Sequence, residues 1–362
     1  MRSVIVKTSI KKILVVKDNC NGTSGGDYHI GILSHKYKKD NDIDVEFIDM
    51  INNAPFNFTN ILKSMIKIKT WNKDGRYDII LCSSPYIHHV IQSLYISRKK
   101  KIPMTVYFHH VVSLNFHPFR RGFLRAISYS IYWNFLLAFV KILKIPIFLD
   151  NHSNYNLSGI TIYEDEDAPS TGKHFDSNID KIYDVCYVGR FQKHKGSNDL
   201  VNFIITCVRK GLNYKMAVVG KISPEYKNRV VRKLARFGAE KNIVFTGFLQ
   251  ENEKNEVVSS SKVFISLSYE EGWSLAVMDA ASAGIPVLAY NLPAYSYLKG
   301  NYFPISSGNI DEAVEKFKFI MENYNVALEK AREARKQVLK YSYDKITSYQ
   351  LNCYNDIINS NT

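Results

Sequence analysis

The stretch YEEGWSLAVMDAASAGIPVLAY, residues 269–290, contains the pattern on which the fold assignment depends. Two glutamates and a glycine follow the apolar run VFISLS (263–268), and a helical pattern carrying Asp279 then leads into a second apolar run, PVLAY (286–290). A strand, a turn, a helix and a second strand in this order form a βαβ unit of a parallel sheet. Because ligands bind beyond the carboxyl ends of such strands, Glu271 and Asp279 are candidates to hold one ligand.

The same alternation extends over the rest of the chain. Further apolar or β-branched runs that predict strands occur at 12–17, 45–50, 78–84, 104–110, 145–150, 184–190, 215–220 and 242–248. Most of the intervening segments are long enough for a crossover helix. The polar and acidic stretch 163–181, with Pro169 and Gly172, interrupts the series and reads as a linker. We therefore predict an α/β protein with two doubly wound domains joined near residue 170.

Composition and charge restrict the partners. The 362 residues carry a formal net charge of +14, which favours nucleic acid, phosphorylated small molecules or an anionic membrane surface. The five cysteines are scattered without CxxC spacing, so we expect reduced thiols in the cytoplasm and no structural zinc. The N-terminal sequence MRSVIVKTSIKKILVV lacks a long apolar core and a cleavage site, so no signal peptide is predicted.

A basic, aromatic segment at 119–145 contains fifteen uncharged residues, AISYSIYWNFLLAFV (126–140). This run is shorter than the roughly 20 residues that span a bilayer. Two interpretations stay open: an interfacial helix whose flanking basic residues contact lipid headgroups, and a buried helix of the first domain. Both could hold for one helix with two faces.

Two loops of the first half are candidates for a binding site. The first predicted strand is followed by a loop with Gly25 and Gly26, whose bare backbone amides and following helix could hold an anion. It is neither a GxGxxG fingerprint nor a P-loop. His109 and His110 lie at the carboxyl end of run 104–110, and successive strand residues point to opposite faces. We therefore expect only one of the two to enter a site, which argues against a metal pair.

The loop after run 184–190 carries two cations. Arg190 follows the strand, Lys195 comes five residues later, and Gly196 opens the next helix. A planar guanidinium and a mobile ammonium beside a helix N-terminus suit a diphosphate.

Taken together, these segments resemble the retaining GT-B glycosyltransferases of glycosyltransferase family 4. VGRFQKHKG (188–196) is similar to the family's G-R-x(4)-K-G segment, and EGWSLAVMDAASAGIPVLA (271–289) is similar to E-G-F-G-x(4)-E-A-x-A-x-G-x-P-V. The resemblance implies an acceptor-binding Rossmann-like domain at 1–170 and a nucleotide-sugar-binding one at 171–340, facing each other across a cleft. A final helix at about 341–362 would pack back on the first domain.

The resemblance also implies roles for single residues. Arg190 and Lys195 would hold the donor diphosphate. Glu271 would contact hydroxyls of the transferred sugar, and Asp279 would bind the ribose. His109, with His110 as the alternative, would contact the sugar near the reacting centre. The remaining implied donor contacts come from the glycine loop and from backbone amides: Gly25, Gly26, Gly272, Trp273, Ser274 and Leu275.

The implied reaction moves a hexose from a UDP-, GDP- or ADP-linked donor to a glycan, a lipid-linked or a small-molecule acceptor, with retention and with neither metal nor cofactor. Three departures from the family pattern are Asp279 in place of glutamate, Trp273-Ser274 in place of Phe-Gly, and Lys221 in a turn that often holds glycine. The alternatives are a sugar-nucleotide epimerase of the same fold and a non-catalytic basic module for nucleic acid or membrane surfaces. Nucleic acid is not expected, because the basic residues form no stripe with stacking aromatics.

Overall fold

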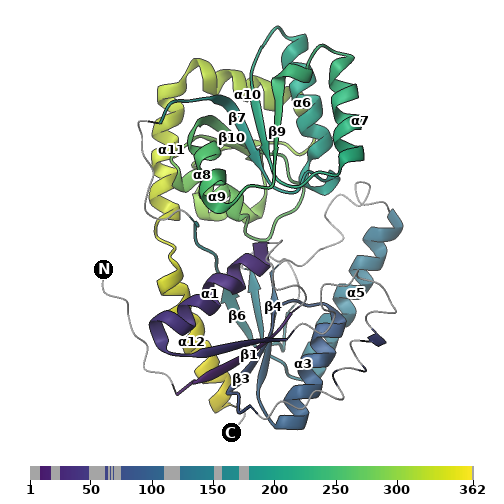
Figure 1. Ribbon diagram of the computed structural model, residues 1–362, viewed down its shortest axis with the longest axis vertical. Coiled ribbons are helices and arrows are strands. Elements are labelled where there is room, and N and C mark those ends of the chain that lie inside the picture. The colour runs from purple at the N-terminus through teal and green to yellow at the C-terminus, as the bar shows by residue number, and fades with distance from the viewer. Residues whose placement is uncertain are drawn as a thin grey trace. The chain divides into compact units, whose positions relative to one another are not determined.

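The protein, seen here in a computed structural model, divides into two compact units (Figure 1). Unit 1 contains strands β1–β6 and the C-terminal helix, and unit 2 contains strands β7–β12; within the described ranges, the chain passes between them at Ile127–Ser128, at Asp167–Ala168 and at Tyr341–Ser342. The structure describes residues 9–17, 25–48, 62–63, 66, 68, 75–109, 123–150, 157–170 and 179–360.

Unit 1 is built on a six-stranded parallel sheet with the order β2-β1-β3-β4-β5-β6. Its strands are β1 (Lys12–Val16), β2 (Asp44–Ile48), β3 (Ile79–Cys82), β4 (Met104–Phe108), β5 (Ile147–Asp150) and β6 (Ile162–Asp165). Strands β3 and β4 are buried at every residue, as expected for parallel strands with helices on both faces. The first five strands were predicted within a few residues. β6 was not, because its outer residues are polar and lie in the predicted linker.

The helices of unit 1 cover both faces of this sheet. They are α1 (Gly25–Asn41), α3 (Ile87–Lys100), α5 (Phe123–Ile142) and α12 (Tyr343–Asn359). Helices α3 and α5 connect β3 to β4 and β4 to β5, and right-handed crossovers place them on the face opposite α1 (Figure 1). The C-terminal helix α12 packs on α1, where the Tyr37 hydroxyl donates to Gln350 Oε1 at 2.6 Å and lies 3.1 Å from the Tyr354 hydroxyl.

Unit 2 repeats this architecture with the strand order β12-β11-β10-β7-β8-β9, again all parallel. Its strands are β7 (Tyr183–Val188), β8 (Met216–Val219), β9 (Ile243–Gly247), β10 (Ser261–Ser266), β11 (Val287–Tyr290) and β12 (Phe303–Ile305). The two predicted doubly wound α/β sheets are thus confirmed. The short edge strand β12 was not predicted, since three residues with a central proline carry little strand signal.

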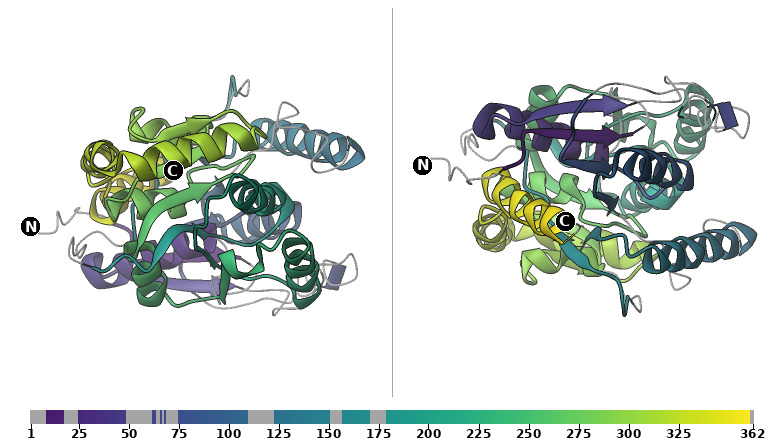
Figure 2. Two further views of the ribbon diagram at one scale, coloured as in Figure 1. Left: turned by 90° about the horizontal axis from the view of Figure 1, so that it is seen from above. Right: turned by 90° about the horizontal axis from the view of Figure 1, so that it is seen from below.

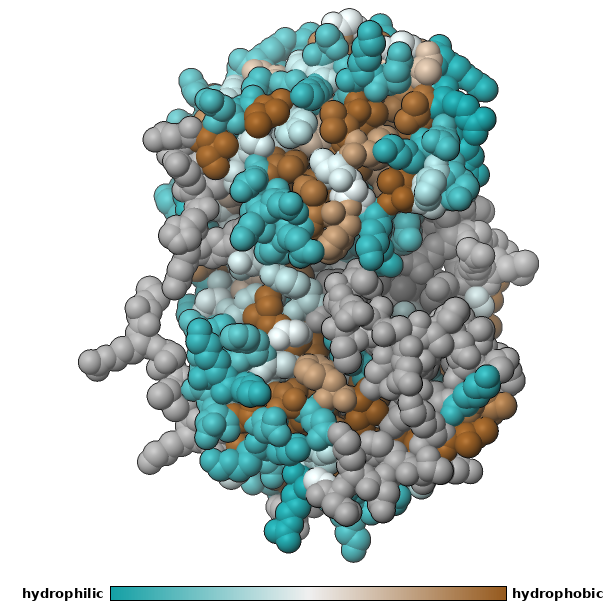
Figure 3. Space-filling view, in the orientation of Figure 1, coloured by the Kyte–Doolittle hydropathy of each residue, from teal (hydrophilic) through white to brown (hydrophobic). Residues whose placement is uncertain are grey.

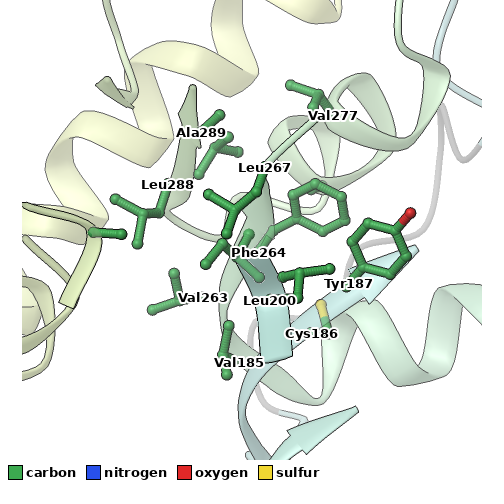
Figure 4. Packing of buried hydrophobic residues seen from close by; sticks show 14 of the residues in the cluster. Val185, Cys186, Tyr187, Leu200, Val263, Phe264, Leu267, Val277, Leu288 and Ala289 are labelled. Carbon is green, nitrogen blue, oxygen red and sulfur yellow. The ribbon is translucent and has the colours of Figure 1, made fainter. Parts of the chain in front are cut away.

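The helices of unit 2 follow the strands in the expected alternation. They are α6 (Ser197–Arg209), α7 (Pro224–Ala235), α8 (Glu251–Ser259), α9 (Leu275–Ser282), α10 (Ile310–Glu322) and α11 (Tyr324–Val338), with short 3₁₀ turns at Lys193–Lys195, Glu240–Asn242 and Pro293–Leu298. Figure 4 shows how side chains of β7, β10 and β11 meet those of α6 and α9 in one core. This packing fixes where the loops after β7 and β10 begin.

The surface of the described residues is mixed, with hydrophobic residues scattered among hydrophilic ones on the face drawn in Figure 3. This is the usual pattern for protein in contact with water. None of the described helices is long and apolar enough to cross a lipid bilayer.

Candidate functional site

The turn after β7 in unit 2 depends on two glycines. Gly220, after β8, has φ of +137°, and a Cβ there would lie 2.0 Å from the Gly189 carbonyl oxygen, so the two turns approach as only glycine allows. The Tyr187 hydroxyl donates to the Arg190 carbonyl at 3.0 Å and fixes the next residue. The Arg190 side chain is exposed and pairs with no acid of the described chain. It is therefore available to an anion.

The 3₁₀ turn Lys193–Lys195 brings Lys195 to the loop after β10. Gly196 ends this turn with φ of +75°, and a Cβ there would lie 1.9 Å from the Leu267 carbonyl oxygen, so the turn packs directly on the β10 loop. The Tyr269 amide donates to the His194 carbonyl at 3.1 Å and joins the same two segments. As a result Lys195 Nζ lies 2.7 Å from Glu271 Oε2.

The Lys195–Glu271 pair is accessible but not fully solvated, since the two side chains are 23% and 13% exposed. Glu271 also lies close to Tyr187 and Tyr295: burial first, and then the charge of Glu271, raise the pKa of both phenols. Arg190 acts in the opposite direction on Tyr187, which places it in the same neighbourhood. Arg190, Lys195 and Glu271 therefore lie together at the carboxyl edge of the unit 2 sheet. Glu270, by contrast, is buried.

Residues Gly272 to Leu275 form the turn into α9. Ser274 is the N-cap of this helix and has φ of 61° and ψ of 75°, a left-handed conformation that is usually left to glycine. The Trp273 side chain is buried, donates to the Met278 sulfur and stacks on Tyr297 with ring centroids 5.3 Å apart. Because this side chain is buried, only the backbone of Trp273 is available for the contact with the donor that the resemblance implies.

Asp279 on α9, which the resemblance implies as the ribose contact, lies in a buried position. Its side chain is 4% exposed, and both oxygens are engaged within unit 2. Oδ1 accepts hydrogen bonds from the Ser170 amide at 2.8 Å and from the Ser170 hydroxyl at 2.7 Å, while Lys254 Nζ lies 2.6 Å from Oδ2. Burial would lower the pKa of Lys254, but the charges of Asp279 and Glu251 outweigh it and raise that pKa.

Unit 1 places His109 in a second polar cluster, directly after β4. Its Nδ1 lies 3.1 Å from Asp165 Oδ2, and its Nε2 lies 3.1 Å from the Ser83 carbonyl oxygen. Both neighbours are acceptors, so the ring donates to both only when it carries both protons. Asp165 is 2% exposed at the end of β6. Burial would raise the pKa of its carboxyl, but His29 and His109 outweigh burial and lower it.

His29 on α1 completes this cluster. It is buried, with Nε2 3.2 Å from Asp165 Oδ1 and Nδ1 in contact with Asp167 Oδ1. Burial would lower the pKa of this imidazole, and the charges of Asp167 and Asp165 raise it well above 6.5. The rings of His29 and His109 lie edge to face at 5.9 Å. A buried carboxylate thus lies between two histidines.

Three further sequence candidates have less structural context. Gly25 and Gly26 are the first residues of α1, while most of the loop before them lies outside the described residues. His110, the alternative to His109, also lies outside the described residues. Within the described ranges, no group of three or more His, Cys, Asp and Glu side chains is arranged to hold a metal ion.

The loops that gather Arg190, Lys195 and Glu271 also carry the similarity to known proteins. Residues 171–340 match the family model of glycosyl transferases group 1. This group 1 segment includes every candidate residue of unit 2 and none of unit 1.

Individual relatives are more distant. The poly(ribitol-phosphate) alpha-N-acetylglucosaminyltransferase of Staphylococcus aureus (strain COL) is 24% identical over 188 residues, covering 51% of this chain and 36% of the relative. The chain spans less than half the length of the curated relatives that it matches.

Solved structures share the whole fold. Sucrose-phosphate synthase from Thermosynechococcus elongatus has a TM-score of 0.75 at 12% identity, covering 97% of this chain and all of that one. HepE of Anabaena, solved in complex with UDP and glucose, has a TM-score of 0.68 at 14% identity, covering 97% and 98%. These similarities confirm the GT-B fold that the resemblance implied.

Sequence reasoning did not identify the partners of the candidate residues. Asp165 and His29 lie next to His109. Ser170 and Lys254 contact the carboxylate oxygens of Asp279 in the group 1 segment. The only available signal was the run of acids in the predicted linker, which includes Asp165. Nothing in the spacing relates Asp165 to His109, which lies 56 residues earlier.

Proposed function

We propose that the protein is a retaining, metal-independent glycosyltransferase that moves a hexose from a nucleotide-sugar donor to a hydroxyl of an acceptor. The observation that carries this proposal is the Lys195–Glu271 pair of the group 1 segment. The packing of Gly196 on the loop after β10 holds this pair beside Arg190. Cations for a diphosphate and a carboxylate for sugar hydroxyls are the two kinds of group that a nucleotide-sugar needs.

In the proposed reaction, Arg190 and Lys195 bind the diphosphate and stabilise the negative charge that develops on it. The bond between the anomeric carbon and the phosphate oxygen breaks, and a bond from the acceptor oxygen forms on the same face of the sugar. The acceptor proton passes to the departing phosphate oxygen. Neither a metal nor a cofactor takes part in this scheme.

Glu271 would orient the sugar by accepting hydrogen bonds from its hydroxyls, and the amides of Gly272–Leu275 would line the sugar and phosphate. Asp279 would reach a ribose only where the ribose hydroxyls replace the Ser170 contacts, since both oxygens are otherwise engaged. Unit 1 would bind the acceptor, and His109, held by Asp165, would act as a hydrogen-bond donor near the reacting centre.

The donor is expected among UDP-, GDP- and ADP-sugars. Because HepE was solved in complex with UDP, UDP is the first nucleotide to test for binding. We propose a glycan or lipid-linked acceptor and a cytoplasmic location, in part on an anionic membrane surface, in keeping with the net charge of +14.

The test begins with thermal unfolding in the presence of each nucleotide and nucleotide-sugar, because a ligand that binds only the folded state raises its stability. Sugar transfer from the stabilising donor is then measured for the wild type and for Glu271→Gln. Glu271→Gln keeps the side-chain shape and removes the charge, so we expect transfer to fall by at least about tenfold while the nucleotide still stabilises the fold. Unchanged transfer, or no stabilisation by any nucleotide, would refute the proposal.

A further inference from the structure

Helix α5 of unit 1 is apolar on two opposite sides. Its inner side buries Trp133, Leu136 and Val140 against the sheet. On its outer side, Ile131 is 65% exposed, Phe135 57% and Ile142 76%. Spacings of four and seven residues align these three side chains along one stripe of the helix.

This outer stripe is unusual within the same chain. Helix α7 buries Val230 and Leu234 and leaves its charged residues to water. Between Ala126 and Ile142, the only charged residue of α5 is Lys141. A helix that is apolar all round is normally covered on every side, yet the outer side of α5, the long helix at the right of both views of Figure 2, is exposed at Ile131, Phe135 and Ile142. Exposed apolar stripes of this kind mark interaction surfaces.

Cations lie beside the C-terminal end of the stripe. Helix α5 ends with Lys141 and is followed by Lys144, and α3 ends with a run of four cations, Arg98–Lys101. The two helices lead into β4 and β5, which are neighbours in register, so both helix ends lie at the same edge of the sheet. Helices packed side by side are about 8–10 Å apart. Neither helix contains an acidic residue.

We propose that α5 docks on the surface of an anionic lipid bilayer. Ile131, Phe135 and Ile142 enter the boundary between headgroups and acyl chains, while the cations at the ends of α3 and α5 contact lipid phosphates. A second copy of the chain is a poorer occupant, because its own cations and net charge of +14 repel. The inference rests on the proposed function in one respect, which is that docking would bring the enzyme to a lipid-linked acceptor.

The test is sedimentation of the full chain with vesicles of phosphatidylcholine alone and with phosphatidylglycerol added. We expect binding to the anionic vesicles only, weakening as salt rises. A triple variant, Ile131→Gln, Phe135→Gln and Ile142→Gln, should lower the affinity by at least about tenfold, because glutamine keeps the helix but not the apolar stripe. Replacing Lys99, Lys100 and Lys101 by glutamine should cost about fivefold for each cation.

The matched control is a second triple variant in unit 2, Phe319→Gln, Val326→Gln and Leu339→Gln, which removes side chains of similar exposure. It should bind vesicles like the wild type. Equal losses in the two triple variants, or no binding of the wild type to anionic vesicles, would overturn the proposal. So would a dimer in sedimentation equilibrium that only the α5 variant abolishes, since the stripe would then belong to a second copy.

Nucleotide binding, followed by thermal unfolding, separates this inference from the proposed function. If nucleotides stabilise a protein that ignores anionic vesicles, the docking surface fails and the function stands. If vesicles bind a protein that no nucleotide stabilises, the function fails and the docking surface stands.

Discussion

At the scale of single residues, Lys195 and Glu271 form an ion pair, with Nζ 2.7 Å from Oε2. A diphosphate would compete with Glu271 for the ammonium, and the freed carboxylate would then accept hydroxyl hydrogen bonds. The pair therefore holds two groups of the candidate binding site in place. The partial exposure of both side chains means that this pair adds little to the stability of the fold.

Lys195→Ala should weaken binding of the nucleoside diphosphate by about 10- to 100-fold, since a hydrogen bond to a charged group contributes about 1.5–3 kcal/mol. Binding of the free nucleoside should stay within about twofold of the wild type, because the nucleoside has no phosphate. Titration calorimetry with both ligands measures this split. Lys193→Ala, in the same turn but exposed, is the control and should leave both affinities unchanged. Equal losses for the two ligands would contradict the role of Lys195.

Ser274 gives a prediction about stability. The left-handed backbone conformation of Ser274 costs any residue with a Cβ about 1–2 kcal/mol of folding free energy. Glycine avoids this cost, but it loses more conformational entropy on folding, which costs about 0.5–1 kcal/mol. Ser274→Gly should therefore raise the free energy of unfolding by about 0.5–1 kcal/mol, measured in urea.

Glu329→Gly, in the regular helix α11, is the opposite case and should lower the free energy of unfolding by about 1 kcal/mol. A destabilised Ser274→Gly protein would show that the serine side chain compensates for its backbone conformation.

At the scale of elements, the strands that the sequence predicted are those with buried, β-branched runs, such as β3, β4 and β10. The two strands that were not predicted, β6 and β12, are short edge strands, and acids in β6 and a proline in β12 weaken their apolar pattern. The other edge strands, β2 and β9, carry more apolar or β-branched residues and were predicted. His109 could be placed at the end of β4 from the sequence. Its carboxylate partner could not, because Asp165 reaches it only through the pairing of β4, β5 and β6.

The joining of α1 to β6 through His29 should make stability depend on pH. The pKa of His29 in the folded protein lies above its unfolded value of about 6.5, so the charged ring stabilises the fold fully below that pH. This contribution is lost as the pH rises through the folded pKa. The Asp165 carboxyl, with its lowered pKa, contributes above about pH 4 and loses its contribution only in acid.

His29→Gln should therefore have a smaller decline in the free energy of unfolding between pH 6.5 and 9 than the wild type, measured by urea unfolding at several pH values. His35→Gln, exposed on the same helix, should follow the wild type. If the His29 variant and the wild type decline in parallel, the charged ring does not hold α1 to β6.

At the scale of the whole molecule, unit 1 contains both the first and the last described helices of the chain. Helix α12 buries Ile346, Leu351 and Tyr354 in this unit, and the Tyr354 hydroxyl contacts those of Tyr37 and Tyr107. Removal of α12 would expose this polar cluster and the apolar surface around it together.

A chain that ends at Tyr341 should therefore lose amide protection throughout unit 1 in hydrogen exchange, while unit 2 keeps the protection of the full chain. Tyr354→Phe is the milder companion and should cost about 1–3 kcal/mol, because it leaves two buried phenols with fewer partners. Full protection of unit 1 in the shortened chain would show that α12 is dispensable for its fold.

The return of the chain to unit 1 through α12 has a consequence for synthesis on the ribosome. Residues 168–341 of unit 2 are complete before any residue of α12 has been translated. Because domains fold as units as the nascent chain emerges, unit 2 acquires its core first, although unit 1 begins at the N-terminus. The sheet β1–β6 must wait with the α12 side of α1 uncovered, so the nascent chain is most exposed to chaperones and proteases in the half that was made first.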